Sequence, residues 1–129
     1  MTVLLDTHAF LWWIDNSNKL SQTAREVIAD SNNKIYLSAV STWEIAIKDQ
    51  LGKLTAPKPL LPFFTDQIHK NNFHFLSIQM EHTCKVNDLE NIHKDPFDRL
   101  LIGQAIIEGI PILTIDSLIS AYRDVKTIW

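Results

Sequence analysis

Apolar residues gather in short runs along the chain, and the longest run predicts a buried helix followed by a strand. Asp95 and Pro96 are typical of a helix start, because aspartate caps free N–H groups and proline needs no N–H at the first position. Residues 97–107 are then apolar on nearly every side of a helix, which indicates burial. Gly109 favours a helix end, and the β-branched segment 110–115 is predicted as a central strand.

The other apolar runs predict strands that alternate with helices. Further strands are predicted at residues 2–5, 34–38, 73–78 and 125–128. Further helices are predicted at residues 8–14, with Thr7 as cap, and at 21–32, 39–51, 63–72, 81–89 and 118–122. For the helix from residue 39, helical spacing predicts Glu44 beside a buried face of Val40, Trp43, Ala46, Ile47 and Leu51. The alternation is typical of an α/β fold with a mainly parallel sheet of about four to five strands, flanked on both faces by helices.

Size, composition and charge narrow the classes of protein. A chain of 129 residues, 46% of them hydrophobic, is typical of a single globular domain spanning residues 1–129. The one cysteine, Cys84, excludes an internal disulfide framework and cysteine-based zinc sites, which fits a cytoplasmic protein. The apolar N-terminal segment contains Asp6 and no Lys or Arg, so we expect neither a signal peptide nor a membrane span. A net charge of −3 is not that of a basic nucleic-acid binder, so action on nucleic acid would require metal ions.

Four acidic residues are predicted at the carboxyl edge of the sheet, where open parallel sheets bind their ligands. Asp6 and Asp116 each follow a predicted strand directly. Asp98 lies in the first turn of the buried helix, whose start faces the same edge. Glu44 lies about one and a half turns into the helix that follows the second strand.

Each acid also has a purely structural interpretation. These are a strand-end turn for Asp6, a capping box with Asp95 for Asp98, a solvent-exposed pair with Lys48 for Glu44, and a helix cap before Ser117 for Asp116. The cap alone explains Asp95. Together, however, carboxylates at one edge repel one another unless cations neutralise them. Oxygen ligands without a thiolate select Mg²⁺ or Mn²⁺, and two such ions about 3.5–4 Å apart activate water for phosphodiester cleavage.

Three separated stretches of the chain resemble the motifs of PIN-domain proteins. They are LLDTHAFLWW, SAVSTWEIAIKDQLGKL and HKDPFDRLLIGQAIIEGIPILTID, in this order. The resemblance covers residues 4–129 and extends more narrowly to the VapC-like ribonuclease toxins of bacterial type II toxin–antitoxin modules. It implies a PIN-like three-layer sandwich, and it matches the family's four metal-binding and catalytic acids to Asp6, Glu44, Asp98 and Asp116.

The same resemblance implies an activity and partners. The activity is that of a Mg²⁺- or Mn²⁺-dependent endoribonuclease, and the partners are an RNA substrate, a second copy of the chain and a cognate antitoxin, with DNA reached only through the antitoxin. The candidate supporting residues are Thr7, Thr114, Arg99 and Asp95. Lys48 and Arg99 either hold the scissile phosphate or balance the acids. His8 and His93 flank the acids and either touch substrate or form structural hydrogen bonds.

Two other functions fit parts of the sequence. A non-catalytic binding module would act only in a complex with an antitoxin and operator DNA. A phosphatase-like enzyme would use Asp6 as a covalent nucleophile, but its motif requires a second acid two residues later, where this chain has His8. The complete set of four acids favours the ribonuclease.

Overall fold

A parallel β-sheet forms the centre of the molecule, and the computed structural model describes all of residues 1–129. The strands are β1 (Thr2–Leu5), β2 (Lys34–Ser38), β3 (His74–Leu76), β4 (Ile112–Leu113) and β5 (Thr127–Ile128), in the order β3-β2-β1-β4-β5. Every neighbouring pair is parallel, so all carboxyl ends of the strands meet at one edge. The central strand β1 pairs with both β2 and β4, and its last residue precedes Asp6.

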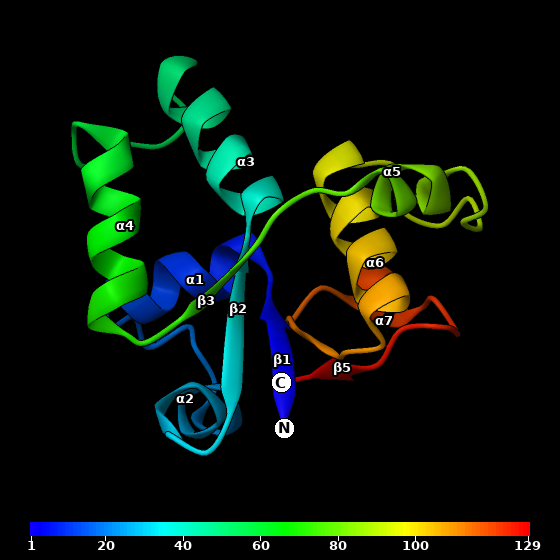
Figure 1. Ribbon diagram of the computed structural model, residues 1–129, viewed down its shortest axis with the longest axis horizontal. Coiled ribbons are helices and arrows are strands. Elements are labelled where there is room, and N and C mark those ends of the chain that lie inside the picture. The colour runs from blue at the N-terminus through cyan, green and yellow to red at the C-terminus, as the bar shows by residue number, and fades with distance from the viewer.

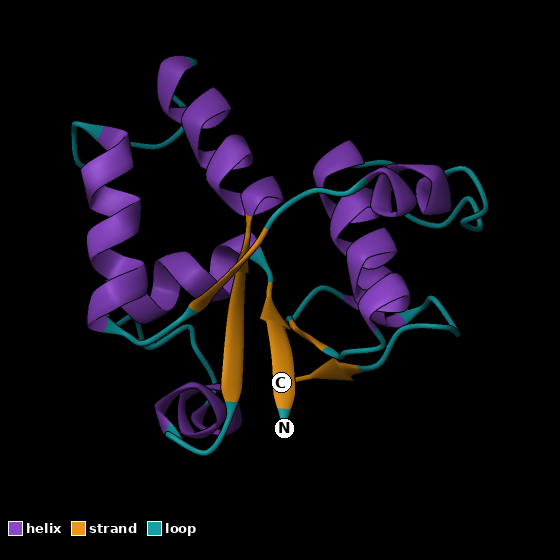
Figure 2. Cartoon of the chain, in the orientation of Figure 1, coloured by secondary structure: helices purple, strands orange, loops and turns teal.

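Helices cover both faces of the sheet (Figures 1 and 2). They are α1 (Thr7–Ile14), α2 (Gln22–Ala29), α3 (Ala39–Gln50), α4 (Leu60–Lys70), α5 (Met80–Val86), α6 (Pro96–Glu108) and α7 (Ser117–Ser120). In Figure 1, α1, α2 and α4 lie on one side of β1 and β2, and α5, α6 and α7 lie on the other. No helix is long and apolar enough to cross a membrane. The predicted three-layer α/β fold with a parallel sheet is therefore confirmed.

Alternating side chains of β1 divide the hydrophobic interior between the two faces. Val3 and Leu5 belong to one buried cluster, which includes Phe10 of α1. Leu4 belongs to a second cluster, which includes Leu101 of α6. Because successive strand residues point to opposite faces, one short strand supplies both layers of the core. This double packing fixes the strand end that carries Asp6.

Several element boundaries differ from those expected. The strands predicted at residues 73–78, 110–115 and 125–128 shorten to β3, β4 and β5. Helix α4 begins at Leu60, three residues earlier than the predicted start at Phe63, because prolines are tolerated in the first helical turn, where N–H groups lack partners. Thr7 is not the cap of α1, since the carboxylate of Asp6 accepts from Ala9 N and makes Thr7 the first helical residue.

The predicted buried face of α3 is wrong for two aromatic or aliphatic positions. Trp43 is 49% exposed and Leu51 is 63% exposed. The residues that are buried include Ser41 and Glu44, which face α1 across a polar contact. Trp43 instead packs its ring edge on Phe97 of α6, with centroids 4.8 Å apart. A polar contact between helices therefore overrides the apolar periodicity of this element.

Candidate metal centre

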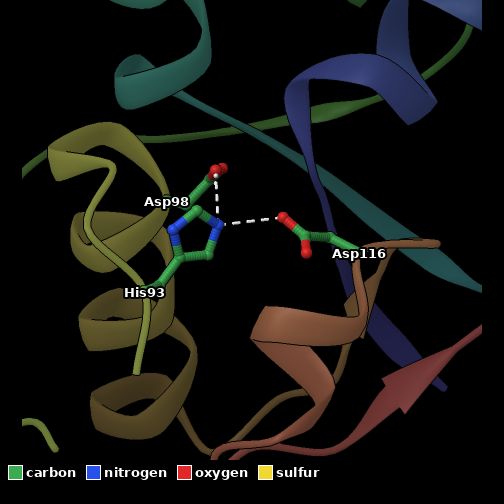
Figure 3. Close-up of side chains that lie close together, drawn as sticks. All are labelled: His93, Asp98 and Asp116. Carbon is green, nitrogen blue, oxygen red and sulfur yellow. Dashed lines mark hydrogen bonds and ion pairs between the residues drawn. The ribbon is translucent and has the colours of Figure 1, made fainter. Parts of the chain in front are cut away.

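The carboxylates of Asp98 and Asp116 both approach the same nitrogen of the His93 imidazole at the carboxyl edge of the sheet (Figure 3). His93 Nε2 lies 3.0 Å from Asp98 Oδ2 and 2.9 Å from Asp116 Oδ2. Asp98 comes from the first turn of α6, and Asp116 is the residue that caps α7. Each of the three side chains offers one ligand atom, and these atoms lie within 4.8 Å of one another. Residues far apart in the sequence thus form one polar cluster.

The backbone determines which ring nitrogen of His93 carries a hydrogen. Asp95 N donates to His93 Nδ1 at 3.1 Å, so Nδ1 is an acceptor and Nε2 is the protonated nitrogen. The ring therefore donates toward both carboxylates and is not itself a ligand in this arrangement. The same contact excludes the capping box that was the structural interpretation of Asp98. In a capping box the Asp98 carboxylate would accept from the Asp95 N–H, but this N–H donates to His93 instead. Asp95 is confirmed as the cap of α6, because its Oδ1 accepts from Phe97 N at 2.8 Å.

Asp6 is buried and held by two donors. Its Oδ1 accepts from Ala9 N at 2.7 Å, and its Oδ2 accepts a short hydrogen bond from Thr114 Oγ1. The hydroxyl of Thr114 also accepts from Asp116 N at 3.0 Å. One threonine consequently joins the acid that follows β1 to the acid that follows β4.

Glu44 is buried as well, with 4% of its surface exposed, so it is not the solvent-exposed acid of the structural alternative. Thr7 Oγ1 donates to its Oε1 at 2.7 Å. Lys48 Nζ donates to its Oε2 at 2.5 Å, one helical turn further along α3. The pair with Lys48 that the sequence suggested is present, between a buried carboxylate and an ammonium whose side chain is 31% exposed.

Electrostatics joins the four acids into one site. Burial raises the pKa of Asp98 to about 7, and the negative charges of Asp95, Glu44 and Asp6 raise it in the same direction, while His93 opposes them. Burial likewise raises the pKa of Asp6, and the charge of Asp116 adds to the rise. The hydrogen bond from Thr114 is the largest influence that lowers this pKa. The hydrogen bond to Glu44 is the main cause that raises the pKa of Lys48. The charges of the carboxylates therefore affect one another's pKa values.

Arg99 has a role that the sequence did not suggest. Its guanidinium donates to the backbone carbonyls of Val86, Glu90 and His93, at 3.0–3.2 Å, and to Tyr122 Oη at 3.1 Å. It contacts no carboxylate. Tyr122 Oη in turn accepts from His93 N at 2.8 Å, so Arg99 and Tyr122 together hold the loop that carries His93.

His93 is the member of the cluster that the sequence did not assign to the site. It was expected either to touch substrate or to form structural hydrogen bonds, and it forms a hydrogen bond with Asp116 and an ion-pair contact with Asp98. Its position two residues before the helix cap Asp95 was the available signal, because a side chain there can reach back to the first turn of the helix.

The donor set fits a hard divalent cation. Carboxylate oxygens converge without a thiolate, and the raised pKa of Asp98 indicates negative charge that the protein leaves incompletely neutralised. Lys48 and His93 are the side chains that form ion-pair contacts with these acids. A divalent ion would remove the remaining repulsion.

Comparison with known proteins identifies the family. The profile of the PIN domain matches residues 3–125, nearly the whole chain. The chain belongs to the PIN domain family. The family resemblance inferred from the three sequence motifs is thereby confirmed.

Curated relatives of this PIN domain include two ribonucleases of Mycobacterium tuberculosis. Ribonuclease VapC16 is 41% identical over 60 residues, a match that covers 46% of this chain and 43% of that protein, so it spans less than half of that relative. Ribonuclease VapC22 is 24% identical over 133 residues, covering 99% of this chain and 98% of that protein.

Solved structures of low sequence identity share the fold. DNA-bound VapBC from Salmonella typhimurium matches with a TM-score of 0.73 at 16% identity, covering 99% of this chain and 97% of that chain. VapBC2 from Rickettsia felis, bound to a promoter DNA fragment, matches with a TM-score of 0.71 at 16% identity, covering 99% and 98%. These matches support the three-layer architecture of the PIN domain.

Proposed function

We propose that this PIN domain is a Mg²⁺- or Mn²⁺-dependent endoribonuclease that acts as the toxin of a toxin–antitoxin pair. The observation that carries the proposal is that four acids lie at the carboxyl edge of the sheet, namely Asp6, Glu44, Asp98 and Asp116. They are close enough that their charges raise the pKa values of Asp6 and Asp98. Its similarity to proteins named ribonucleases VapC16 and VapC22 supports RNA as the substrate.

The four acids would hold the metal, and the rest of the chain prepares them for it. The bound ion would supply a water of lowered pKa and stabilise charge on the phosphate. Thr114 and the amide of Ala9 fix the orientation of Asp6. His93 keeps Asp98 and Asp116 side by side through its Nε2–H.

Glu44 and Lys48 form the part of the site that is already neutral. Thr7 fixes one oxygen of Glu44 and Lys48 fixes the other. The charges of Asp95 and Asp98 also raise the pKa of Lys48, so its ammonium lies close to the acids that would hold the metal. At this position it can attract the phosphate group of a substrate. We therefore assign Lys48 to phosphate binding in addition to its pairing with Glu44.

Asp6→Asn tests the proposal directly. Asparagine keeps the cap of α1, because it is as good a cap as aspartate, but it removes the charge. We expect purified wild-type protein to cleave RNA with Mn²⁺ and not with EDTA, and Asp6→Asn to abolish cleavage with an unchanged circular-dichroism spectrum. Asp66→Asn, the same change at an exposed acid of α4, is the matched control. Equal cleavage by wild type and Asp6→Asn would refute the assignment.

The antitoxin partner is proposed on separate grounds. Two solved structures similar to this chain are VapBC complexes bound to DNA. We propose that this chain likewise binds a cognate antitoxin and reaches DNA only through it, and that it forms the homodimer that its family resemblance implies. Co-expression with the neighbouring gene tests this, since co-purification supports it. Binding without any Mn²⁺-dependent cleavage by the free protein would instead favour the non-catalytic binding module.

A further inference from the structure

A cleft opens beside Glu44, and none of the three residues labelled in Figure 3 lines it. Its volume is about 350 Å³, within the range of about 300–1,000 Å³ that is usual for small-ligand sites. It lies between α1 and the end of α3, and its lining residues are Thr7, His8, Leu11, Glu44, Lys48, Lys53 and Leu54. Because Thr7 and Glu44 also belong to the candidate metal centre, the cleft is continuous with that site.

The charge of the cleft favours an anion. Glu44 is the only acid that lines it, and Lys48 neutralises Glu44 through their 2.5 Å contact. Lys53 is exposed and forms no ion pair, unlike Lys48 and Lys58. One free ammonium therefore remains in a chain whose net charge is −3. A phosphate group is the ligand chemistry that such a point charge binds.

The walls of the cleft suit a nucleobase. His8 is exposed on the first turn of α1, and Leu11 and Leu54 provide apolar surface. The His8 ring lies 5.5 Å from the ring of Trp12, which in turn lies 5.8 Å from the ring of Trp129. Proteins that bind single-stranded nucleic acid combine such aromatic surfaces with basic grooves, because every base has a stacking face.

We propose that this cleft is a subsite for one nucleotide of single-stranded RNA, next to the phosphate that is cleaved. Lys53 binds the phosphate of this nucleotide, and its base stacks on His8. The inference rests on the proposed ribonuclease function for its substrate, and it adds the side from which the RNA strand enters the site. It also assigns substrate contacts to two residues outside the acidic cluster.

Binding of a fluorescent oligoribonucleotide in EDTA tests the subsite without cleavage. Lys53→Ala should weaken binding and should reduce the slope of log affinity against log salt concentration by about 0.7, the value for one lost phosphate contact on a single strand. Lys53→Arg should retain the slope. Lys126→Ala is the matched control and should behave as wild type. Lys126 is exposed and directly precedes β5, so it lies at the amino ends of the parallel strands, opposite the carboxyl edge that carries the acids.

His8 tests the base contact. His8→Ala should weaken oligoribonucleotide binding about tenfold, and His8→Phe should restore it, because phenylalanine keeps a stacking face. Under Mn²⁺, both Lys53→Ala and His8→Ala should raise KM and leave kcat within about twofold, because binding of a flanking nucleotide adds affinity without taking part in the bond cleavage.

The outcomes separate the subsite from the proposed function. If wild type binds RNA but does not cleave it, while Lys53→Ala still lowers the salt slope, the ribonuclease proposal fails and the subsite stands. If wild type cleaves RNA and Lys53→Ala matches Lys126→Ala in salt slope and KM, the subsite is wrong and the ribonuclease proposal stands. A His8→Phe variant as weak as His8→Ala would remove base stacking from the proposal.

Discussion

The two halves of the acidic site are held in different ways. Asp6 and Glu44 are buried, and each carboxylate has two donors of its own: Ala9 N and Thr114 for Asp6, and Thr7 and Lys48 for Glu44. Asp98 and Asp116 have side chains that are 21% and 31% exposed, and both contact the one ring nitrogen of His93, although Asp116 also accepts from Leu118 N at 2.8 Å. The fold therefore preorganises the first half more fully, while in the second half Asp98 depends on the ring of His93.

The same difference appears in the influences that oppose the rise in pKa of the two acids. Burial raises the pKa of both Asp6 and Asp98, but hydrogen bonds from Thr114 and Ala9 lead the opposing influences at Asp6. At Asp98 the nearby charge of Asp95 adds to burial, and His93 is the opposing influence. Because the pKa of each carboxylate is raised, a divalent ion would favour the ionised form of both. The comparison can be tested by perturbing each half separately.

Metal binding should give the largest effect. At an Mn²⁺ concentration about 100-fold above the dissociation constant, a site present only in the folded state stabilises it by about 2.7 kcal/mol. We expect Mn²⁺ to raise the melting temperature of the wild type and to have little effect on Asp98→Asn. Differential scanning calorimetry with and without EDTA measures this. An undiminished shift in Asp98→Asn would mean that the second half does not bind the ion.

The pH dependence of Asp98 should give the next largest effect. Its pKa is about 7 in the folded protein against an ordinary 3.8, so between these values the folded state holds one proton more than the unfolded state. The free energy of unfolding of the metal-free protein should therefore fall as pH rises from about 4 to about 7, and then level off. With partial exposure taken into account, the loss is about 2 kcal/mol.

Urea denaturation in EDTA across this pH range measures the loss. Asp98→Asn lacks the titrating group, so its free energy of unfolding should exceed that of the wild type above pH 7. Asp66→Asn, at an exposed acid of α4, should follow the wild type at every pH. Parallel curves for wild type and Asp98→Asn would contradict the prediction, because they would show that folding does not raise the pKa of Asp98.

Much of this site follows from local sequence signals and one rule of topology. The cap at Asp95 and the left-handed Gly109, with φ of 67°, bound α6 as expected. Acids that follow strands of a parallel sheet must meet at one edge, which predicted that Asp6 and Asp116 lie near one another. These features depend on residues close in sequence or on strand direction, and the sequence carries both.

The remaining features depend on contacts between distant segments. His93 lies in a loop without periodic pattern, and Arg99 and Tyr122 set the course of that loop. Glu44 is buried because Thr7, on another helix, donates a hydrogen bond to its carboxylate. The sequence pattern within α3 does not predict this contact. The same polar contact explains why Trp43 is turned outward against the expected apolar stripe. Tertiary hydrogen bonds therefore override the local periodicity.

Thr114→Val should destabilise the first half of the site by about 1.5 kcal/mol, because it leaves the buried Oδ2 of Asp6 without its donor. The variant also removes the acceptor of Asp116 N, so it perturbs both halves through one hydroxyl. Urea denaturation measures the change. Thr83→Val is the control, since its exposed hydroxyl bonds only to a carbonyl of its own helix. A Thr114→Val variant as stable as the control would mean that Asp6 needs no donor.

His93→Ala should have the smallest effect, about 1 kcal/mol in the metal-free protein, because the hydrogen bonds it removes are partly open to solvent. Mn²⁺ should narrow this gap, since the ion neutralises the same two carboxylates. His93→Gln, which keeps an N–H donor, should lie between wild type and His93→Ala.

The metal affinity of these variants decides what His93 is. Because Nδ1 accepts from Asp95 N, Nε2 carries a hydrogen and is a donor to the acids, so the Mn²⁺ dissociation constant of His93→Ala should change by at most about 10- to 100-fold. Loss of a true ligand would weaken binding far more, beyond the roughly 10- to 100-fold that is typical when only a supporting group is removed. Isothermal titration of Mn²⁺ into wild type and both His93 variants distinguishes the two. A large loss shared by His93→Ala and His93→Gln would make the imidazole a ligand, and the second half of the site would then hold its ion with nitrogen as well as oxygen.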